Sequence, residues 1–188
     1  MALTALDPNT ALLVVDLQKG IVGLPSIHPI SAVVERSRAL LDAFRARRLP
    51  VVLINAAGVA PGRTEQPARA PKLLPEGFTD FIPELDWRPD DIVVTKRTWG
   101  AFATTDLETR LKAIGVTQVV VVGVATGTGV EATARQAFEA GFNVTLALDA
   151  MTDVRAEAHS YSLRNVFPRL GETGTAKDII RILETRNA

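Results

Sequence analysis

The chain has 188 residues, of which 47% are apolar and 22% charged, a composition typical of one globular domain covering residues 1–188. Its 21 basic and 21 acidic side chains give a formal net charge of zero, so nothing favours nucleic acid or a membrane surface as a partner. Cysteine is absent, which excludes disulfides, thiolate metal sites and a thiol nucleophile. The sequence shows neither a signal peptide nor an apolar run that could span a bilayer, and we therefore expect a cytoplasmic protein.

In the first half of the chain, short apolar runs alternate with an amphipathic segment. Residues 11–15 predict a first strand that ends at Asp16, and residues 50–55 predict a second. Between them, residues 30–48 predict a helix, because apolar side chains recur on one face at Ile30, Val33, Val34, Leu41 and Phe44. Residues 57–78 are so rich in glycine and proline that we expect an irregular loop, which at this length is usually a lid or a partner surface.

The second half continues the same alternation. Strands are predicted over residues 91–95, 118–123 and 143–149, and the second of these is almost wholly apolar, as expected at the centre of a parallel sheet. Helices are predicted after Thr105, from about Gly129 to Gly141, near 155–166, and over 176–185. Their apolar stripes comprise Leu107, Leu111 and Ile114 in the first, Val130, Ala134, Ala137 and Phe138 in the second, and Ala176, Ile179, Ile180 and Leu183 in the last.

This order of strands and helices predicts an α/β fold, a three-layer α/β/α sandwich with a central, mostly parallel sheet. Residues 119–122 should be among its most buried. In such sheets ligands bind at the carboxyl ends of the strands. We therefore expect the residues that follow the strands to form the site.

An acid, an amide, a lysine and a glycine-rich turn stand at these strand ends. They are Asp16, Asn55, Lys96 and residues 123–129, with Asp149 further along. Each also has a purely structural interpretation: Asp16 could cap a turn, Asn55 could bond loop backbone, Lys96 could be a solvated charge and Asp149 could hold the following loop. The turn matches neither G-x-x-x-x-G-K-[ST] nor G-x-G-x-x-G, although it could hold an anion at a helix start.

Other catalytic classes have little support in the sequence. The only histidines, His28 and His159, belong to no cluster with metal-ligand spacing, and we expect His28 in a surface loop. A G-x-S-x-G nucleophile motif is missing, as are the acidic pair and the phosphate loop of receiver and flavodoxin domains. The sequence therefore predicts no metal and no cofactor.

Several segments together resemble the signature regions of the isochorismatase-like (cysteine) hydrolases. The matching segments are Leu13-Val-Val-Asp16-Leu-Gln18, Lys96 with Ala101-Phe102 and Thr105-Asp106-Leu107, Val122-Gly-Val-Ala-Thr126 through Val130-Glu-Ala-Thr-Ala-Arg135, and Asp149-Ala-Met-Thr-Asp153. The resemblance covers nearly the whole chain in the family's order and spacing. It implies the sandwich fold and a homo-oligomer, for which residues 58–77 and the segment containing Trp87 would be the contact surfaces.

The resemblance also implies a catalytic set of Asp16, Lys96 and, at the position of the family's cysteine, Gly129. In cysteine members the thiol attacks an amide, the aspartate takes its proton, and N–H groups at the helix start, here residues 128 and 129, face the substrate. The expected substrate-binding residues are Asn55, Trp99, Ala125, Thr126 and Thr128. The Asp-x-His metal motif of nicotinamidase-like members is missing.

Two functions follow from this resemblance. The first is a hydrolase of a small polar metabolite with Asp16 as general acid or base, and the isochorismatase branch, which resembles this chain in having glycine at about position 129, favours an enol ether. That branch carries an aromatic-rich turn where Ala125 and Thr126 stand here, so the particular substrate stays open. The alternative is an inactive relative that binds a small molecule or supports an assembly. A third interpretation, an engineered Gly129, fits less well because alanine or serine is the usual replacement for cysteine.

Overall fold

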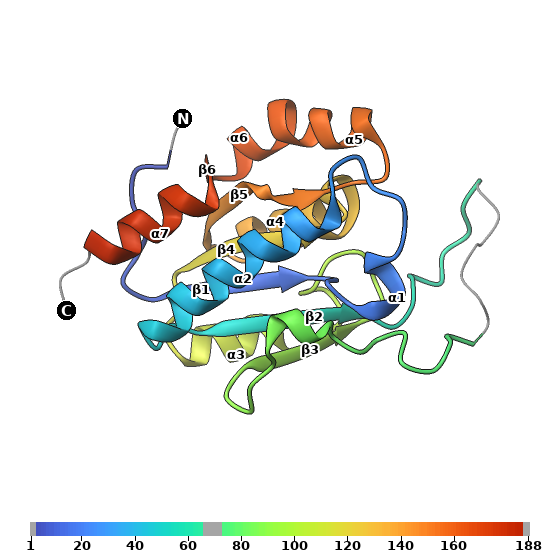
Figure 1. The fold of residues 1–188 in the computed structure, drawn as a ribbon, viewed down its shortest axis with the longest axis horizontal. Coiled ribbons are helices and arrows are strands. Elements are labelled where there is room, and N and C mark those ends of the chain that lie inside the picture. The colour runs from blue at the N-terminus through green and yellow to red at the C-terminus, as the bar shows by residue number, and fades with distance from the viewer. Residues whose placement is uncertain (1–2, 66–72, 186–188) are drawn as a thin grey trace.

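The computed structural model describes residues 3–65 and 73–185 and contains one six-stranded sheet, all of whose strands are parallel (Figure 1). The strand order is β3-β2-β1-β4-β5-β6. The strands are β1 (Thr10–Val15), β2 (Val51–Ala56), β3 (Ile92–Lys96), β4 (Gln118–Val124), β5 (Asn143–Thr152) and β6 (Glu172–Gly174). The chain runs outward from β1 to β3, then returns to the other side of β1 as β4, so the order reverses between β1 and β4.

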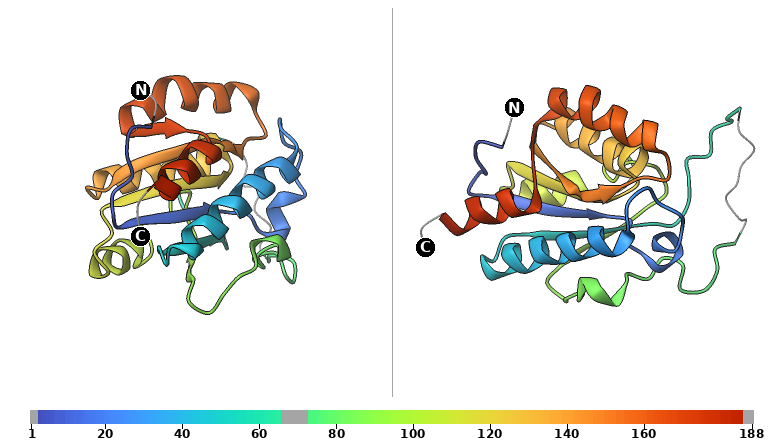
Figure 2. Two further views of the ribbon diagram at one scale, coloured as in Figure 1. Left: turned by 60° about the vertical axis from the view of Figure 1, so that its left-hand side comes forward. Right: turned by 45° about the horizontal axis from the view of Figure 1, so that its top comes forward.

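Helices cover both faces of the sheet, which confirms the three-layer α/β/α sandwich. Helices α2 (Ile30–Ala46) and α7 (Ala176–Thr185) lie in front of the sheet in Figure 1 and share one apolar core with it. Three helices supply side chains to the core on the other face: α3 (Leu107–Ala113), α4 (Glu131–Glu139) and α6 (Phe167–Leu170). Helix α5 (Ala156–Tyr161) runs through the π-helical turn η3 (Ser162–Val166) into α6, as the second view in Figure 2 shows. Two further helical segments are short: α1 (Lys19–Val22) and η1 (Pro83–Leu85).

Strand β4 is buried along its whole length, and the predicted burial of residues 119–122 is confirmed, since each is 0% exposed. Its side chains alternate between the two cores, with Val119 and Val121 in one and Val120 and Val122 in the other. A strand that is covered on both faces needs apolar residues at every position, which explains its unbroken valine run.

Strand β5 is longer than predicted, because it continues to Thr152 instead of ending at residue 149. Asp149 therefore lies inside the strand, where its carboxylate accepts the Ala176 N–H at 2.7 Å and pairs with Arg36 at 3.2 Å. It thus fixes the start of α7 and does not reach the other strand-end residues. Strand β6, with three residues, is too short to show a periodic pattern and escaped prediction.

The helices lie where the sequence predicts them, but some of their ends and buried faces differ from the prediction. Helix α2 ends at Ala46, and Arg48 then takes a positive φ of 55°. Ile114 lies beyond the end of α3 and is 52% exposed, and Phe138 is 50% exposed on the outer side of α4, so neither belongs to its predicted stripe. The predicted single helix at 155–166 is interrupted by η3.

The segment after β2 extends away from the body of the molecule at the carboxyl edge of the sheet (Figure 1). It lacks regular structure over residues 57–65, as predicted, and residues 66–72 of the predicted loop lie outside the described residues. No helix within residues 3–65 and 73–185 is both long and apolar enough to cross a membrane.

Candidate functional site

Asp16 stands immediately after β1, beside the point where the strand order reverses. Its backbone N–H donates to the Ile54 carbonyl at 2.9 Å, which continues the pairing of β1 with β2. Its φ of 56° is positive, a conformation that aspartate tolerates better than most residues. The residue is only 5% exposed. Parallel sheets form their ligand crevice at such a reversal, so Asp16 lies where a site is expected.

Lys96, the last residue of β3, forms a buried ion pair with Asp16. Its Nζ lies 2.8 Å from Asp16 Oδ2 and donates also to the Thr98 carbonyl at 3.3 Å. The Lys96 side chain is 2% exposed and that of Asp16 8%. Because β2 separates their two strands, the Lys96 side chain has to extend across β2 to reach Asp16. The other oxygen, Asp16 Oδ1, is buried and has no hydrogen-bond partner among the described residues.

Burial raises the pKa of Asp16 to about 6, although the charge of Lys96 and its hydrogen bond act in the opposite direction. Desolvation is the larger effect because the carboxylate loses most of its contact with water. A carboxyl group with this pKa populates both its forms near neutral pH. It can therefore donate or accept a proton during catalysis.

A glycine-containing turn also lies against Asp16. The π-helical turn η2 (Thr126–Val130) follows β4, and the Ala125 carbonyl accepts the N–H groups of Thr128 and Val130, each at 3.1 Å. A Cβ placed on Gly129 would lie 3.0 Å from Asp16 Oδ2 and 3.0 Å from the Val124 carbonyl oxygen. The backbone at Gly129 therefore packs directly beside the carboxylate. π-Helical turns occur frequently at functional sites.

The structure brings Asp16, Lys96 and Gly129 together, while the other predicted residues differ in their surroundings. Asn55 is buried, donates from Nδ2 to the Thr79 carbonyl at 2.9 Å, and leaves Oδ1 without a partner among the described residues. Trp99 is 61% exposed in the segment after β3. Thr126 is fully buried and its hydroxyl lies 2.9 Å from His159 Nδ1. The Thr128 N–H, expected to face the substrate, donates within its own turn.

Three side chains next to the site were not identified as functional from the sequence. Gln18 is fully buried and holds both the end of β2 and residue 78, through bonds to Ala56 N (2.6 Å), Ala56 O (3.1 Å) and Phe78 O (3.0 Å). The sequence signal that could have identified Gln18 is its position two residues after Asp16. Asp153 and His159 contact η2, and nothing in the sequence indicates these contacts, because they depend on how β5 and α5 pack.

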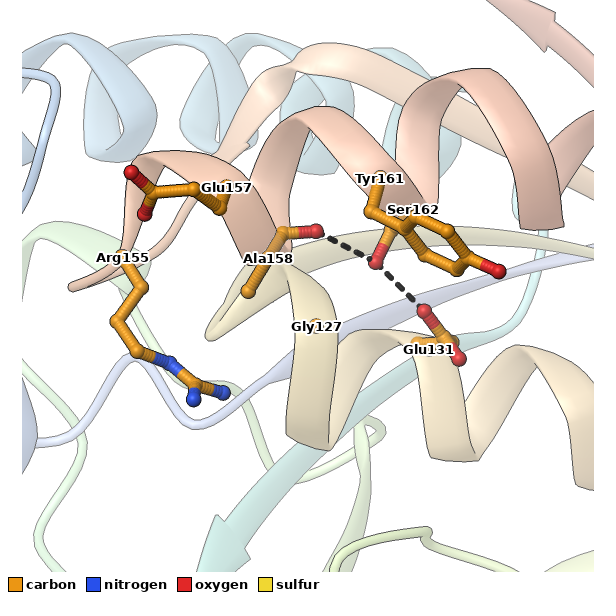
Figure 3. Close-up of a pocket in the computed structure, with 7 residues that line it drawn as sticks. All are labelled: Gly127, Glu131, Arg155, Glu157, Ala158, Tyr161 and Ser162. Atoms are coloured by element: carbon orange, nitrogen blue, oxygen red, sulfur yellow. Dashed lines mark hydrogen bonds between the residues drawn. The ribbon is translucent and has the colours of Figure 1, made fainter.

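A surface hollow lies away from the pair of Asp16 and Lys96. It has a volume of about 480 Å³, opens widely to solvent and lies between the start of α4 and α5, lined by residues that include Gly127, Glu131, Arg155 and Tyr161 (Figure 3). Neither Asp16 nor Lys96 lines it. His28 and His159 pack edge to face at 4.9 Å, and residues 3–65 and 73–185 contain no group of three or more side chains that could hold a metal ion.

These observations define a doubly wound α/β protein. It carries a buried pair of an aspartate and a lysine at the point where the strand order reverses. The model of the isochorismatase domain matches residues 10–178, and the chain belongs to the isochorismatase family.

Curated relatives and solved structures agree with this membership. The chain is 39% identical over 183 residues to the isochorismatase family protein YecD of Escherichia coli O157:H7, covering 93% of this chain and 96% of that protein. It is 37% identical over 178 residues to YwoC of Bacillus subtilis strain 168, covering 92% and 93%. The solved structure of an isochorismatase family protein from Burkholderia thailandensis superposes with a TM-score of 0.91 at 40% identity, covering 96% of this chain and 98% of that one. Both the predicted fold and the predicted family are therefore confirmed.

Proposed function

We propose that this isochorismatase-family hydrolase cleaves a small polar metabolite of the enol-ether type by proton transfer at Asp16. The observation that carries the proposal is the buried pair of Asp16 and Lys96, in which one carboxylate oxygen is bonded and the other has no partner among the described residues. An unpaired buried acceptor is costly unless a ligand or water satisfies it. Asp16 Oδ1 is therefore the atom that we assign to proton exchange with the substrate.

Hydrolysis of an enol ether begins with protonation of the enol carbon. The protonated Asp16 donates this proton, which leaves an oxocarbenium ion on the substrate and a carboxylate on the protein. Water adds to the ion and returns a proton to Asp16, and the resulting hemiketal breaks into a ketone and an alcohol. The pKa of about 6 keeps about a tenth of Asp16 protonated at pH 7.

Lys96 supports this cycle through its charge. Its ammonium at 2.8 Å stabilises the carboxylate that forms when Asp16 gives up its proton. The same contact fixes Oδ2 and so orients Oδ1. We therefore assign Lys96 to orienting Asp16 and to stabilising negative charge as it develops.

The proposed chemistry requires no thiol, and the chain contains no cysteine. A side chain at position 129 would stand against the Asp16 carboxylate and the Val124 carbonyl. With glycine there, no side chain of residue 129 stands between the turn η2 and Asp16. We propose that Gly129 stands where cysteine members of the family carry their nucleophile.

The test measures kcat of the purified protein on an enol ether and on simple amides. Asp16→Asn and Lys96→Ala should each lower kcat on the enol ether by about 10²–10⁴-fold with the fold intact, because general acid–base catalysis contributes about that factor. Glu108→Gln and Lys112→Ala are matched controls, since these residues form an exposed ion pair at 2.6 Å on α3. Near wild-type turnover in Asp16→Asn would overturn the mechanism. A wild-type protein that binds enol ethers without cleaving them would instead support a binding protein.

A further inference from the structure

The segment of residues 153–159, which leads from the end of β5 into α5, holds the turn that lies against Asp16. Asp153 Oδ2 accepts the N–H of Gly127 at 2.7 Å, and His159 Nδ1 lies 2.9 Å from the hydroxyl of Thr126. Ala158 packs closely against Gly127, because a Cβ added to Gly127 would lie 3.0 Å from the Cβ of Ala158. Three residues from one segment therefore contact two consecutive residues of η2.

These contacts are shielded from water, which makes them strong and directional. Asp153 is 3% exposed, His159 7% and Thr126 0%. The second oxygen of Asp153 accepts the N–H of Arg155 at 3.0 Å, so the carboxylate joins the turn to the start of α5. A hydrogen bond to an ionised acceptor is about twice as strong as one between neutral groups.

His159 is itself held in place by its neighbours. Its ring packs against the ring of His28 at 4.9 Å, and His28 Nδ1 lies 3.1 Å from the Thr152 hydroxyl, at the end of β5. Burial, followed by the proximity of His28, lowers the pKa of His159, while Asp153 acts in the opposite direction. A lowered pKa favours the uncharged ring, which suits a bond to the neutral Thr126 hydroxyl.

The same turn carries the backbone that shields Asp16. Gly129 lies two residues after Gly127, and the position of its Cβ is 3.0 Å from Asp16 Oδ2. The Gly129 carbonyl is bonded in turn by the Thr133 hydroxyl at 2.7 Å, which ties the end of η2 to α4. A displacement of η2 at residues 126 and 127 would therefore open a path for water to the carboxylate.

We propose that Asp153 and His159 are positioning residues, which hold η2 against Asp16 and keep its carboxyl group dry. The role rests on the proposed function only in so far as Asp16 is the proton-transfer group. Neither residue contacts Asp16 in this structure, so both act through the turn.

The experiment determines the pKa of Asp16 by carboxyl ¹³C NMR in the full chain, which needs no substrate. In Asp153→Ala and in Thr126→Val the Asp16 pKa should fall from about 6 toward its ordinary value, by at least about one unit, because water then reaches the carboxylate. Asp153→Asn is the decisive control. Like Asp153→Ala, it removes the negative charge of Asp153, but it keeps a side-chain oxygen that can accept the Gly127 N–H. The Asp16 pKa should therefore stay near 6.

Kinetics provide the second measurement, on any substrate found. Asp153→Ala should lower kcat by about ten- to a hundredfold with little change in KM, and Asp153→Asn should restore most of it, since small misplacements of a catalytic group have effects of this size. Glu157→Ala, an exposed acid on the same segment, should change neither the Asp16 pKa nor kcat.

The outcomes separate this inference from the proposed function. A shifted Asp16 pKa in Asp153→Ala, in a protein that cleaves no enol ether, supports the positioning role and refutes the function. If the Asp16 pKa is the same in folded Asp153→Ala and Asp153→Asn, the positioning role is wrong, whatever the activity. Should Asp153→Ala fail to fold, Thr126→Val decides the question, because it preserves side-chain shape and both acidic groups.

Discussion

At the scale of single residues, Asp16 is governed by two opposing effects, burial and the neighbouring ammonium of Lys96. Burial is the larger, so the folded protein binds the Asp16 proton more tightly than the unfolded chain does. Its contribution to stability is therefore fully present below the ordinary pKa of 3.8 and is lost as pH rises through about 6. The site is maintained at a cost in stability at neutral pH, where Asp16 is mostly ionised.

This predicts a pH-dependent difference in stability between the wild-type protein and Asp16→Asn. Between about pH 4 and about pH 7 the free energy of unfolding of the wild type should fall relative to that of the variant by about 2 kcal/mol, because asparagine does not titrate. Urea denaturation at several pH values measures the difference, with Glu108→Gln as a surface control. A difference that stays constant, or that changes in the opposite direction, would show that Asp16 is not held in a desolvated state.

Gly129 offers a second test at the residue scale. We expect Gly129→Cys to hydrolyse simple amides slowly through an acyl-enzyme visible by mass spectrometry, because its Cβ would lie 3.0 Å from Asp16 Oδ2 and the thiol would therefore stand beside a carboxylate that can take its proton. Gly129→Ala adds the same Cβ without the thiol and should show no amidase activity. The wild-type activity should be unaffected by alkylating reagents. A folded, alkylatable and inactive Gly129→Cys protein would mean that the site is not built for addition to a carbonyl.

At the scale of elements, the close approach of β4 to β1 determines where the site lies. Gly123 has a positive φ of 114°, and a Cβ there would fall 2.0 Å from the Val15 carbonyl oxygen and 2.8 Å from the Val15 nitrogen. The register of β4 with β5 also shifts at this point, between Val121 and Gly123. Glycine at 123 thus allows the end of β4 to pass beside the residue that precedes Asp16 and to deliver η2 to the crevice.

We therefore predict that Gly123→Ala destabilises the protein by at least about 3 kcal/mol, as the sum of backbone strain and a clash with rigid main chain. Gly141→Ala is the matched control, since Gly141 also has a positive φ, 88°, but a Cβ there meets nothing within 4 Å. It should cost only about 1–2 kcal/mol, the penalty of the left-handed conformation itself. Equal losses in urea denaturation would show that the contact with Val15 has no energetic role.

At the scale of the whole molecule, several large apolar side chains are exposed to solvent. Leu73 is 86% exposed, Trp99 61% and Trp87 55%. Leu73 lies in the predicted contact loop, and Trp87 in the second predicted contact segment. Side chains of this kind, when grouped on a surface, commonly mark contacts between proteins.

We accordingly predict self-association, with sedimentation at micromolar concentration giving a multiple of the 20.2 kDa chain mass. Trp87→Ser should shift the equilibrium toward the monomer. Tyr161→Ser, which removes an aromatic side chain that is 61% exposed on α5, should leave it unchanged. A clean monomer in the wild type would refute the prediction, and an equal response to both substitutions would place the contact elsewhere.

The sequence by itself predicted the layered parallel sheet and placed Asp16 and Lys96 at strand ends, where the structure finds them bonded to each other. Local patterns indicate this, because an unbroken valine run in residues 119–122 is typical of a strand covered on both faces, and strand ends in parallel sheets meet at one edge. The sequence could not place Asp149, because the end of a strand depends on its neighbour's length.

Only the tertiary structure determined the pKa of Asp16 and the contacts that hold the turn η2. The distance between Asp16 and Lys96, which are 80 residues apart, determines the charge acting on the carboxyl group, and the packing around it determines the desolvation that outweighs this charge. The contacts of Gly127 with Asp153 and of Thr126 with His159 likewise join residues 26 and 33 positions apart. The charge effect on Asp16, its desolvation and these hydrogen bonds depend on distances and burial in three dimensions. Such distances and burial arise only when separate segments of the chain pack together.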